Sequence, residues 1–140
     1  MRFWDSSALV ALLVAHASSS QLRTLYASDA EAVAWTLSDV EIRSALARLE
    51  RDAALSNKDY QEAVSRAEAL WKTLHVVSLV DTVKNRAKRL LGVHLLRSAD
   101  ALQLGAALTV TLDDPLGVEF VCLDERLTDA ARREGFVLLP

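Results

Sequence analysis

The stretch MRFWDSSALVALLVAHA, residues 1–17, decides how the rest of the chain is interpreted. It begins with residues suited to a buried strand, Arg2–Asp5, and continues into an apolar run that predicts a helix over Ser7–His16. Asp5 stands at the junction. A charge in that place is typical of a strand that ends there and presents a polar group at its carboxyl edge, next to the first turn of a helix.

The same stretch could instead be a secretion signal. Arg2 would then be the charged start, Ala8 to Ala15 the apolar core, and Ala15-His16-Ala17 a small-residue cleavage site. Asp5 argues against this alternative, because such a leader carries positive charge in that region and only Arg2 supplies it. We therefore expect an ordinary strand and helix.

Composition bounds the remaining possibilities. A chain of 140 residues is about one domain long, so we expect a single domain over residues 1–140. Cys122 is the only cysteine, which favours a reducing compartment such as the cytoplasm. The longest apolar run, Ala8 to Ala15, falls short of the roughly 18 residues that cross a bilayer, so no membrane segment is expected. The net charge of −3 means that any binding of nucleic acid must be local.

Short β-rich segments alternate with longer helical patterns along the whole chain. The predicted strands are 2–5, 32–37, 75–80, 119–123 and 136–139. The predicted helices are 7–16, 18–28, one that begins at Ser38, 56–74, 81–95, 98–112 and 124–135. This order predicts an α/β fold with a mainly parallel sheet covered by helices on both faces.

In such a sheet, functional groups gather at the carboxyl ends of the strands. Asp5 follows the first predicted strand and Asp124 the fourth, while Glu41 and Asp100 lie near the amino ends of two buried helices. Each acid has a structural explanation when taken alone. Ser38 and Glu41 fit a capping box, Asp100 lies in a first turn after a possible cap at Ser98, and Asp5 and Asp124 suit N-caps.

Taken together, the four acids indicate a functional site, because residues that only cap helices would not need to lie close to one another. Four carboxylates at one edge would repel each other by roughly 1 to 4 kcal/mol per close pair, depending on the surroundings. A bound divalent cation removes that cost. Oxygen donors without a nearby His or Cys pair favour Mg²⁺ or Mn²⁺ over Zn²⁺.

Four segments carry a resemblance to a known family: WDSSALV, SDVEIRSAL, LRSADALQLGAAL and FVCLDERLTDAARREGF. In this order and spacing they resemble the PIN domain, and most closely the bacterial VapC-type toxins of type II toxin–antitoxin modules. The resemblance implies a three-layer α/β/α fold with a central, mainly parallel five-stranded sheet. It also implies a metal-dependent endoribonuclease that leaves a 5′-phosphate and a 3′-hydroxyl, a homodimer, and an antitoxin protein that binds at the acidic cleft.

By position, the resemblance assigns the catalytic and metal-binding roles to Asp5, Glu41, Asp100 and Asp124. Ser7 matches a small polar residue that supports the first acid, and Arg97 matches an arginine that often precedes the third. Two positions depart from the family pattern. Cys122 stands where relatives often have Thr or Ser, so this position lacks the hydroxyl that could contact metal or phosphate. Gln103 stands where many relatives carry His.

Basic residues cluster in two helical segments, where they could contact RNA phosphates or simply face solvent. They are Arg43, Arg48, Arg51 and Lys84, Arg86, Lys88, Arg89, Arg97. The three histidines are expected in packing or surface roles and the three tryptophans in the core. Two further functions stay open: a non-catalytic PIN-like binding module, and a receiver-type signalling domain, which would need paired acids after the first strand and a lysine after the last.

Overall fold

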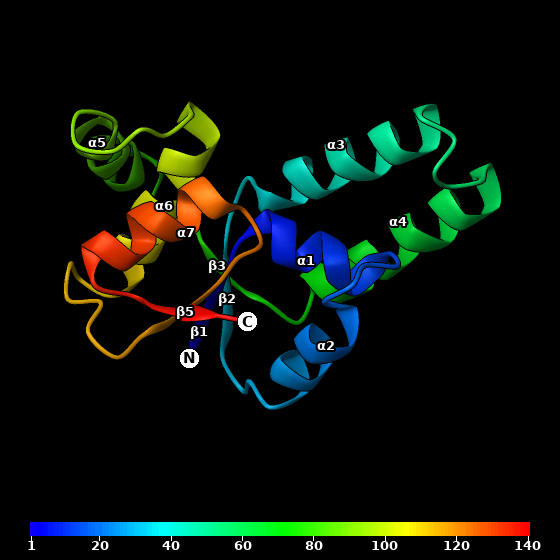
Figure 1. The fold of residues 1–140 in the computed structure, drawn as a ribbon, viewed down its shortest axis with the longest axis horizontal. Helices are drawn as coiled ribbons and strands as arrows, with labels where there is room; N and C mark the ends of the chain where they lie inside the picture. The colour runs from blue at the N-terminus through cyan, green and yellow to red at the C-terminus, as the bar shows by residue number, and fades with distance from the viewer.

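The computed structural model describes residues 1–140 and shows a five-stranded, fully parallel sheet with helices on both faces (Figure 1). The strand order is β3-β2-β1-β4-β5. The strands are β1 (Arg2–Trp4), β2 (Ala32–Trp35), β3 (His75–Val77), β4 (Glu119–Val121) and β5 (Val137–Leu139). The helices are α1 (Ser6–Leu13), α2 (Ser19–Ala27), α3 (Ser38–Arg51), α4 (Asn57–Trp71), α5 (Val80–Leu91), α6 (Ser98–Val110) and α7 (Glu125–Glu134). None of these helices has the length and apolar character needed to cross a membrane.

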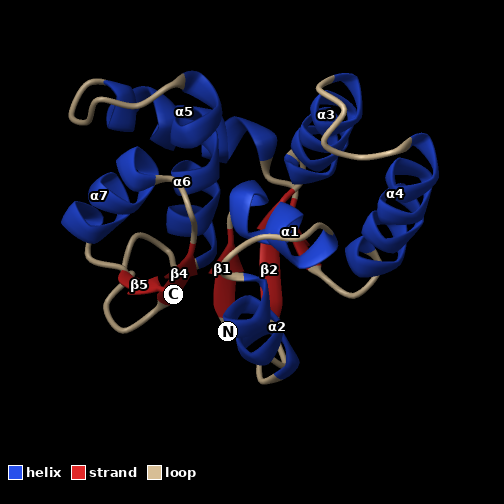
Figure 2. Ribbon diagram, turned by 45° about the vertical axis from the view of Figure 1, so that its right-hand side comes forward, coloured by secondary structure: helices blue, strands red, loops and turns tan.

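The two faces of the sheet build two separate hydrophobic clusters. Because side chains alternate along a strand, Phe3 and its neighbour Trp4 point to opposite faces. Phe3 packs in the cluster shared with α5, α6 and α7, and Trp4 packs in the cluster shared with α1 to α4. Figure 2 shows the strands between these two groups of helices. The expected three-layer α/β/α arrangement is confirmed.

Helix α6 is buried on nearly all sides, as its apolar composition predicts. It packs closely on α5 at Gly105, where a Cβ would lie 3.0 Å from the carbonyl oxygen of Val83. A larger residue at position 105 would therefore push the two helices apart. This tight packing fixes the amino end of α6, which carries Asp100, relative to the sheet.

Several helix ends follow the predicted capping residues. Ser56 caps α4 by accepting a hydrogen bond from the Asp59 N–H, and Gly135 ends α7 in the left-handed conformation with φ of 106°. Trp4 and Trp35 are fully buried as expected, whereas Trp71 is only partly buried.

Four predicted helices are too long, and one of them is the helix predicted over 56–74, which ends at Trp71. The first ends at Leu13 rather than His16, because the Ser19 hydroxyl donates to the carbonyl oxygens of Ala11 and Val14 and the chain turns there. The helix predicted to Leu95 ends at Leu91, with Gly92 as its C-cap. The helix predicted to Leu112 ends at Val110.

Candidate active site

The topology brings all four predicted acids to the carboxyl edge of the sheet. Asp5 directly follows β1, and Asp124 follows β4, the parallel neighbour of β1. Glu41 lies in the first turn of α3, which begins just after β2, and Asp100 lies in the first turn of α6. The acids therefore share one edge, although 119 positions separate the first from the last in the sequence.

Asp5 is the most buried of the four, with 3% of its surface exposed. Its Oδ2 accepts hydrogen bonds from the backbone N–H and the hydroxyl of Ser7, and the Cys122 thiol lies 3.5 Å from the same oxygen. Asp5 is thus the N-cap of α1, as its position predicts. Burial raises the pKa of Asp5, although these hydrogen bonds oppose the shift.

The Glu41 carboxylate accepts hydrogen bonds from two side chains of other helices and does not cap its own helix. The Ser6 hydroxyl donates to Glu41 Oε2 at 2.7 Å, and Gln103 Nε2 donates to the same oxygen at 3.1 Å. The predicted capping box of Ser38 and Glu41 is wrong, because Leu37 is the N-cap and Ser38 Oγ accepts instead from Gln103 Nε2 at 2.9 Å. Ser38 and Glu41, the two residues of the predicted box, thus bond to side chains of other helices.

The remaining two acids each satisfy a helix end. Asp100 Oδ2 accepts from the backbone N–H of Arg97 at 3.2 Å, and Asp124 Oδ1 accepts from the backbone N–H of Leu127 at 3.0 Å. Asp124 is therefore an N-cap as predicted, whereas Arg97, and not Ser98, is the N-cap residue of α6. Capping uses only one oxygen of each carboxylate. Glu41 Oε1, Asp100 Oδ1 and Asp124 Oδ2 accept no hydrogen bond.

The four acids influence one another electrostatically. Burial is the main cause of the raised pKa of Glu41, and the charges of Asp5 and Asp100 raise it further. Burial likewise raises the pKa of Asp100, and the charge of Asp124 adds to the effect. The four carboxylates form a connected group of like charges, which we call the acid cluster.

The acid cluster is open rather than a closed cage. No three His, Cys, Asp or Glu side chains come close enough to enclose a metal ion by themselves. An open set of oxygens still fits a hard divalent ion, because Mg²⁺ in proteins keeps several waters and commonly binds only one or two carboxylates. The unbonded oxygens of Glu41, Asp100 and Asp124 are carboxylate oxygens, the type of donor that such an ion prefers.

Two surface hollows adjoin the acid cluster, and Leu123 lines both. The first, of about 600 Å³, lies between α1 and α3 and includes Ser6, Ser7 and Glu41; we call it the α1–α3 groove. The second, of about 380 Å³, is lined by Arg97, Asp100, Asp124, Arg126 and two neighbours; we call it the arginine hollow. A ligand can therefore approach the acids from two sides.

Ser7 and Cys122 lie at the base of the cluster. Besides donating to Asp5, the Ser7 hydroxyl accepts the backbone N–H of Leu123 at 3.0 Å, so it ties the end of β4 to α1. Cys122 is 3% exposed, and burial together with the charge of Asp5 strongly raises the pKa of its thiol. The thiol is therefore uncharged at neutral pH and contacts Asp5 from within the protein.

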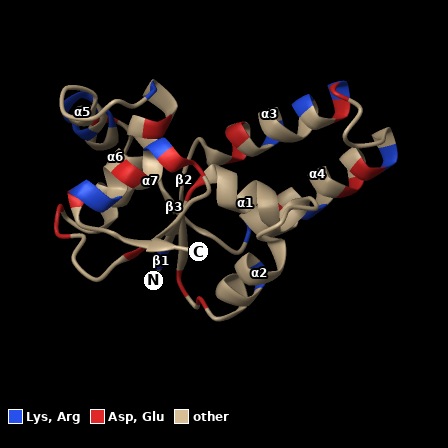
Figure 3. Ribbon diagram, viewed as in Figure 1, with Lys and Arg blue, Asp and Glu red and all other residues tan.

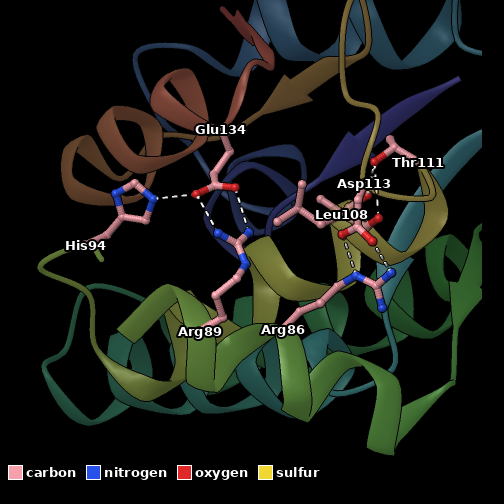
Figure 4. A network of polar contacts seen from close by, with 8 residues as sticks. Arg86, Arg89, His94, Leu108, Thr111, Asp113 and Glu134 are labelled. Atoms are coloured by element: carbon pink, nitrogen blue, oxygen red, sulfur yellow. Dashed lines mark hydrogen bonds and ion pairs between the residues drawn. The ribbon is translucent and has the colours of Figure 1, made fainter. Parts of the chain in front are cut away.

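The basic residues divide into two groups. Arg97 lines the arginine hollow without an ion pair of its own, and its predicted contact with a phosphate stays a prediction. Lys84, Arg86 and Arg89 are instead paired with acids of the protein, and Arg86 and Arg89 form the network shown in Figure 4. In the structure these three residues therefore bond to acids of the protein, which favours the structural alternative for them over a phosphate contact.

Sequence reasoning missed two residues of the site. Ser6 holds Glu41 directly, and Arg126 faces Asp100 and Asp124 in the arginine hollow. Ser6 follows Asp5 at once, and Arg126 lies two positions after Asp124, so closeness to the predicted acids is the signal that could have found them. Gln103 was noted only as a departure from the family pattern, and the structure places it on Glu41.

The chain has relatives among known proteins in both sequence and fold. No family model matches the chain. The chain is similar to Ribonuclease VapC45 of Mycobacterium tuberculosis (strain CDC 1551 / Oshkosh), at 33% identity over 138 residues that cover 99% of this chain and 94% of the relative.

Two solved structures share the fold. The crystal structure of Mycobacterium tuberculosis VapC20, a Sarcin-Ricin loop cleaving toxin, gives a TM-score of 0.66 at 20% identity and covers 98% of this chain and 97% of that one. A toxin-antitoxin complex from Klebsiella pneumoniae gives a TM-score of 0.64 at 14% identity, over 89% of this chain and 87% of that one.

Proposed function

Because this chain belongs to the VapC family of PIN-domain ribonucleases, we propose that it is a toxin that cuts RNA at the acid cluster with Mg²⁺ or Mn²⁺ as cofactor. The observation that carries the proposal is the grouping of Asp5, Glu41, Asp100 and Asp124 at one edge of the sheet. The raised pKa values of Asp5, Glu41 and Asp100 indicate an arrangement that costs folding energy, which is typical of functional sites.

The side chains at the site favour a water molecule as nucleophile. The Cys122 thiol is buried and uncharged, and the Ser7 hydroxyl is engaged with Asp5 and Leu123. Neither is therefore available to attack a phosphate. The chemistry that a divalent ion supplies at such a site is a lowered pKa for a bound water and neutralisation of charge on the reacting phosphate.

The other residues of the site bind and orient. Ser6 and Gln103 hold Glu41, and Ser7 holds Asp5, so the carboxylates keep their positions before the substrate arrives. Arg97 and Arg126 stand beside Asp100 and Asp124, where a guanidinium can pair with a phosphate oxygen of the RNA. In keeping with the family, the proposed products carry a 5′-phosphate and a 3′-hydroxyl.

The proposal extends to partners and compartment. The fold shared with the Klebsiella pneumoniae toxin-antitoxin complex supports a cognate antitoxin, and the family resemblance supports a homodimer in the cytoplasm. Coexpression with the product of a short reading frame that abuts this one, followed by copurification and mass measurement, tests both assemblies. Failure to copurify would contradict the antitoxin, and a monomeric mass would contradict the dimer.

The central experiment compares wild type, Asp5→Asn and the control Asp39→Asn on total cellular RNA. Asp39 is an exposed acid in the first turn of α3, next to Glu41 but outside the cluster. We expect cleavage by wild type and Asp39→Asn in Mg²⁺, none in chelator, and a loss of at least about 100-fold in Asp5→Asn, the upper end of what outer-shell changes cost. Mapping the cut ends identifies the products.

Equal cutting by wild type and Asp5→Asn, or cutting that chelator leaves unchanged, would overturn the mechanism. A direct Mn²⁺ titration separates the enzyme from a non-catalytic module of the same fold. If the wild-type protein binds no Mn²⁺, the acid cluster is not a metal site and the binding-module alternative is favoured.

A further inference from the structure

The α1–α3 groove continues well beyond the acid cluster. Ser6 and Glu41 lie where it meets the cluster, its walls include Val10, Val14 and Val40, and Arg48 also lines it. Arg48 follows Glu41 by seven residues on the same helix, which places it about 10 Å further along the helix axis. Figures 1 and 2 show α1 and α3 extending side by side from the edge of the sheet.

Arg48 has no partner within the protein. Its side chain forms no ion pair or hydrogen bond, whereas Arg43, five residues earlier on α3, is paired with Glu68 at 3.2 Å. Figure 3 shows acidic residues in the first turn of α3, basic residues along its middle, and both signs of charge at its end, where Glu50 and Arg51 lie. Arg48 is thus an exposed and unpaired guanidinium in a groove that leads to the acids.

The arginine hollow repeats this pattern on the other side. Arg97 and Arg126 are also unpaired, and they lie beside Asp100 and Asp124. The charges therefore run from basic through acidic to basic across the site. A polyanion that crosses the acid cluster with a divalent ion at its centre satisfies all three regions, because its flanking phosphates meet arginines on both sides. A peptide with a single acidic residue could pair with the arginines on one side of the acid cluster only, and the arginines on the other side would have no ligand.

From this arrangement we propose that the α1–α3 groove is the binding site for the RNA strand on one side of the cut phosphate. In this site Arg48 pairs with a phosphate that flanks the cut one. Val10, Val14 and Val40 contact the base that lies between these two phosphates. Arg97 and Arg126 hold the strand on the other side. The inference rests on the proposed function, since it assigns the path of the substrate through the same site.

Binding of RNA by full-length protein that carries Asp5→Asn tests the inference without cleavage. The probe is a short single-stranded RNA of random sequence labelled with fluorescein, and its anisotropy is followed over a range of salt concentrations. We expect Arg48→Ala to weaken binding roughly tenfold, as loss of a charged hydrogen bond does. The slope of log affinity against log salt should fall by about 0.7, the value for one phosphate contact on a single strand.

Arg51→Ala is the matched control, because Arg51 is an unpaired arginine of the same helix that does not line the groove. It should leave both the affinity and the slope unchanged. The inference is overturned if Arg48→Ala binds like its parent, if Arg51→Ala loses as much, or if the parent binds no RNA.

A second pair of variants adds a charge instead of removing one. Ser44 is exposed and lines the groove between Glu41 and Arg48, whereas Ser65 is exposed on α4 away from the site. Ser44→Glu should weaken RNA binding at least as much as Arg48→Ala, and Ser65→Glu should not. If Ser44→Glu weakens only the binding of a copurified antitoxin, the groove holds peptide and the inference is wrong.

The outcomes separate this inference from the proposed function. In protein with Asp5 intact, Arg48→Ala should raise KM and leave kcat nearly unchanged, because Arg48 lies away from the reacting phosphate. RNA binding that depends on Arg48 in a protein that never cuts would contradict the proposed function alone. Cutting that is indifferent to Arg48 would contradict the inference alone.

Discussion

Two groups of charged residues in this molecule have similar composition and opposite arrangements. In the network around α5, Arg86 pairs with Asp113, and Glu134 accepts from Arg89 and His94, each at 2.7 Å (Figure 4). At the carboxyl edge of the sheet, the acids face one another, and the nearby arginines have no partner. Charges that pair within the protein hold its helices together, whereas charges left unpaired are available to a ligand.

The pKa values of the carboxyl groups show the same contrast. The Arg86 guanidinium lowers the pKa of Asp113, and the hydrogen bonds of Glu134 lower its pKa despite burial. Burial and like charges raise the pKa of Glu41 and Asp100. The protein thus stabilises the charged form of Asp113 and Glu134 and disfavours the charged form of Glu41 and Asp100.

Gln103→Leu should have the largest effect among three tests of this contrast. It removes the amide that holds Glu41 while keeping the position apolar and filled, and it also removes the buried Gln103 Oε1, which has no hydrogen-bond partner. We expect Mn²⁺ affinity, measured by calorimetry, to fall about 10- to 100-fold. Stability should fall by about 1 to 3 kcal/mol as well, because the buried Ser38 hydroxyl loses its hydrogen-bond partner. Gln103→His restores an N–H donor and should recover part of the affinity. Unchanged affinity in Gln103→Leu would show that Glu41 needs no such support.

Glu134→Gln should come next, with a loss of about 1 to 3 kcal/mol of unfolding free energy at neutral pH and normal RNA cleavage. Because the folded-state pKa of Glu134 lies below its ordinary 4.5, its stabilisation is complete above that pH and is lost as the pH falls through the folded-state value. Denaturant unfolding should therefore show wild type and variant converging below about pH 4.5. Glu62→Gln, at an exposed site on α4, is the control. A difference that grows in acid would contradict the assignment.

Asp100→Asn should have the smallest effect of the three, and it should stabilise the protein, whereas Glu134→Gln destabilises it. Removing one charge relieves repulsion from Asp124 and Glu41, so in chelator the variant should be more stable than wild type by about 1 kcal/mol or less. Thermal unfolding with added Mg²⁺ should then stabilise wild type more than the variant, since binding to the folded state is what raises its stability. A variant less stable than wild type in chelator would mean that the Asp100 charge is satisfied within the protein.

The sequence predicted the grouping of the four acids better than it predicted the contacts that support them. Asp5 and Asp124 follow buried strands, and the carboxyl ends of parallel strands must meet at one edge, so their grouping followed from strand order. The role of Glu41 was harder to see, because Ser38 and Glu41 match a capping box in sequence. Only the packing of α3 against α1 and α6 shows that Ser6 and Gln103, 35 and 62 positions away from Glu41, take those bonds instead.

The sequence is equally limited in what it shows about the basic residues. A run such as Lys84 to Arg89 shows in sequence that charge is present, but not whether each charge is already paired. Arg86 and Arg89 find their acids 27 and 45 residues away, in segments that approach α5 only once α6 and α7 have packed.

What the sequence by itself determined is local: the alternation of strands and helices, the capping residues at several helix ends, and the acids that follow the strands. These depend on neighbours a few positions apart, so the pattern of residue types carries them. The tertiary structure alone decided which charges meet a partner and which do not, because that depends on distances between segments remote in the chain. The unpaired Arg48 and Arg126, and the groove that leads from Glu41, became visible only when those segments were brought together.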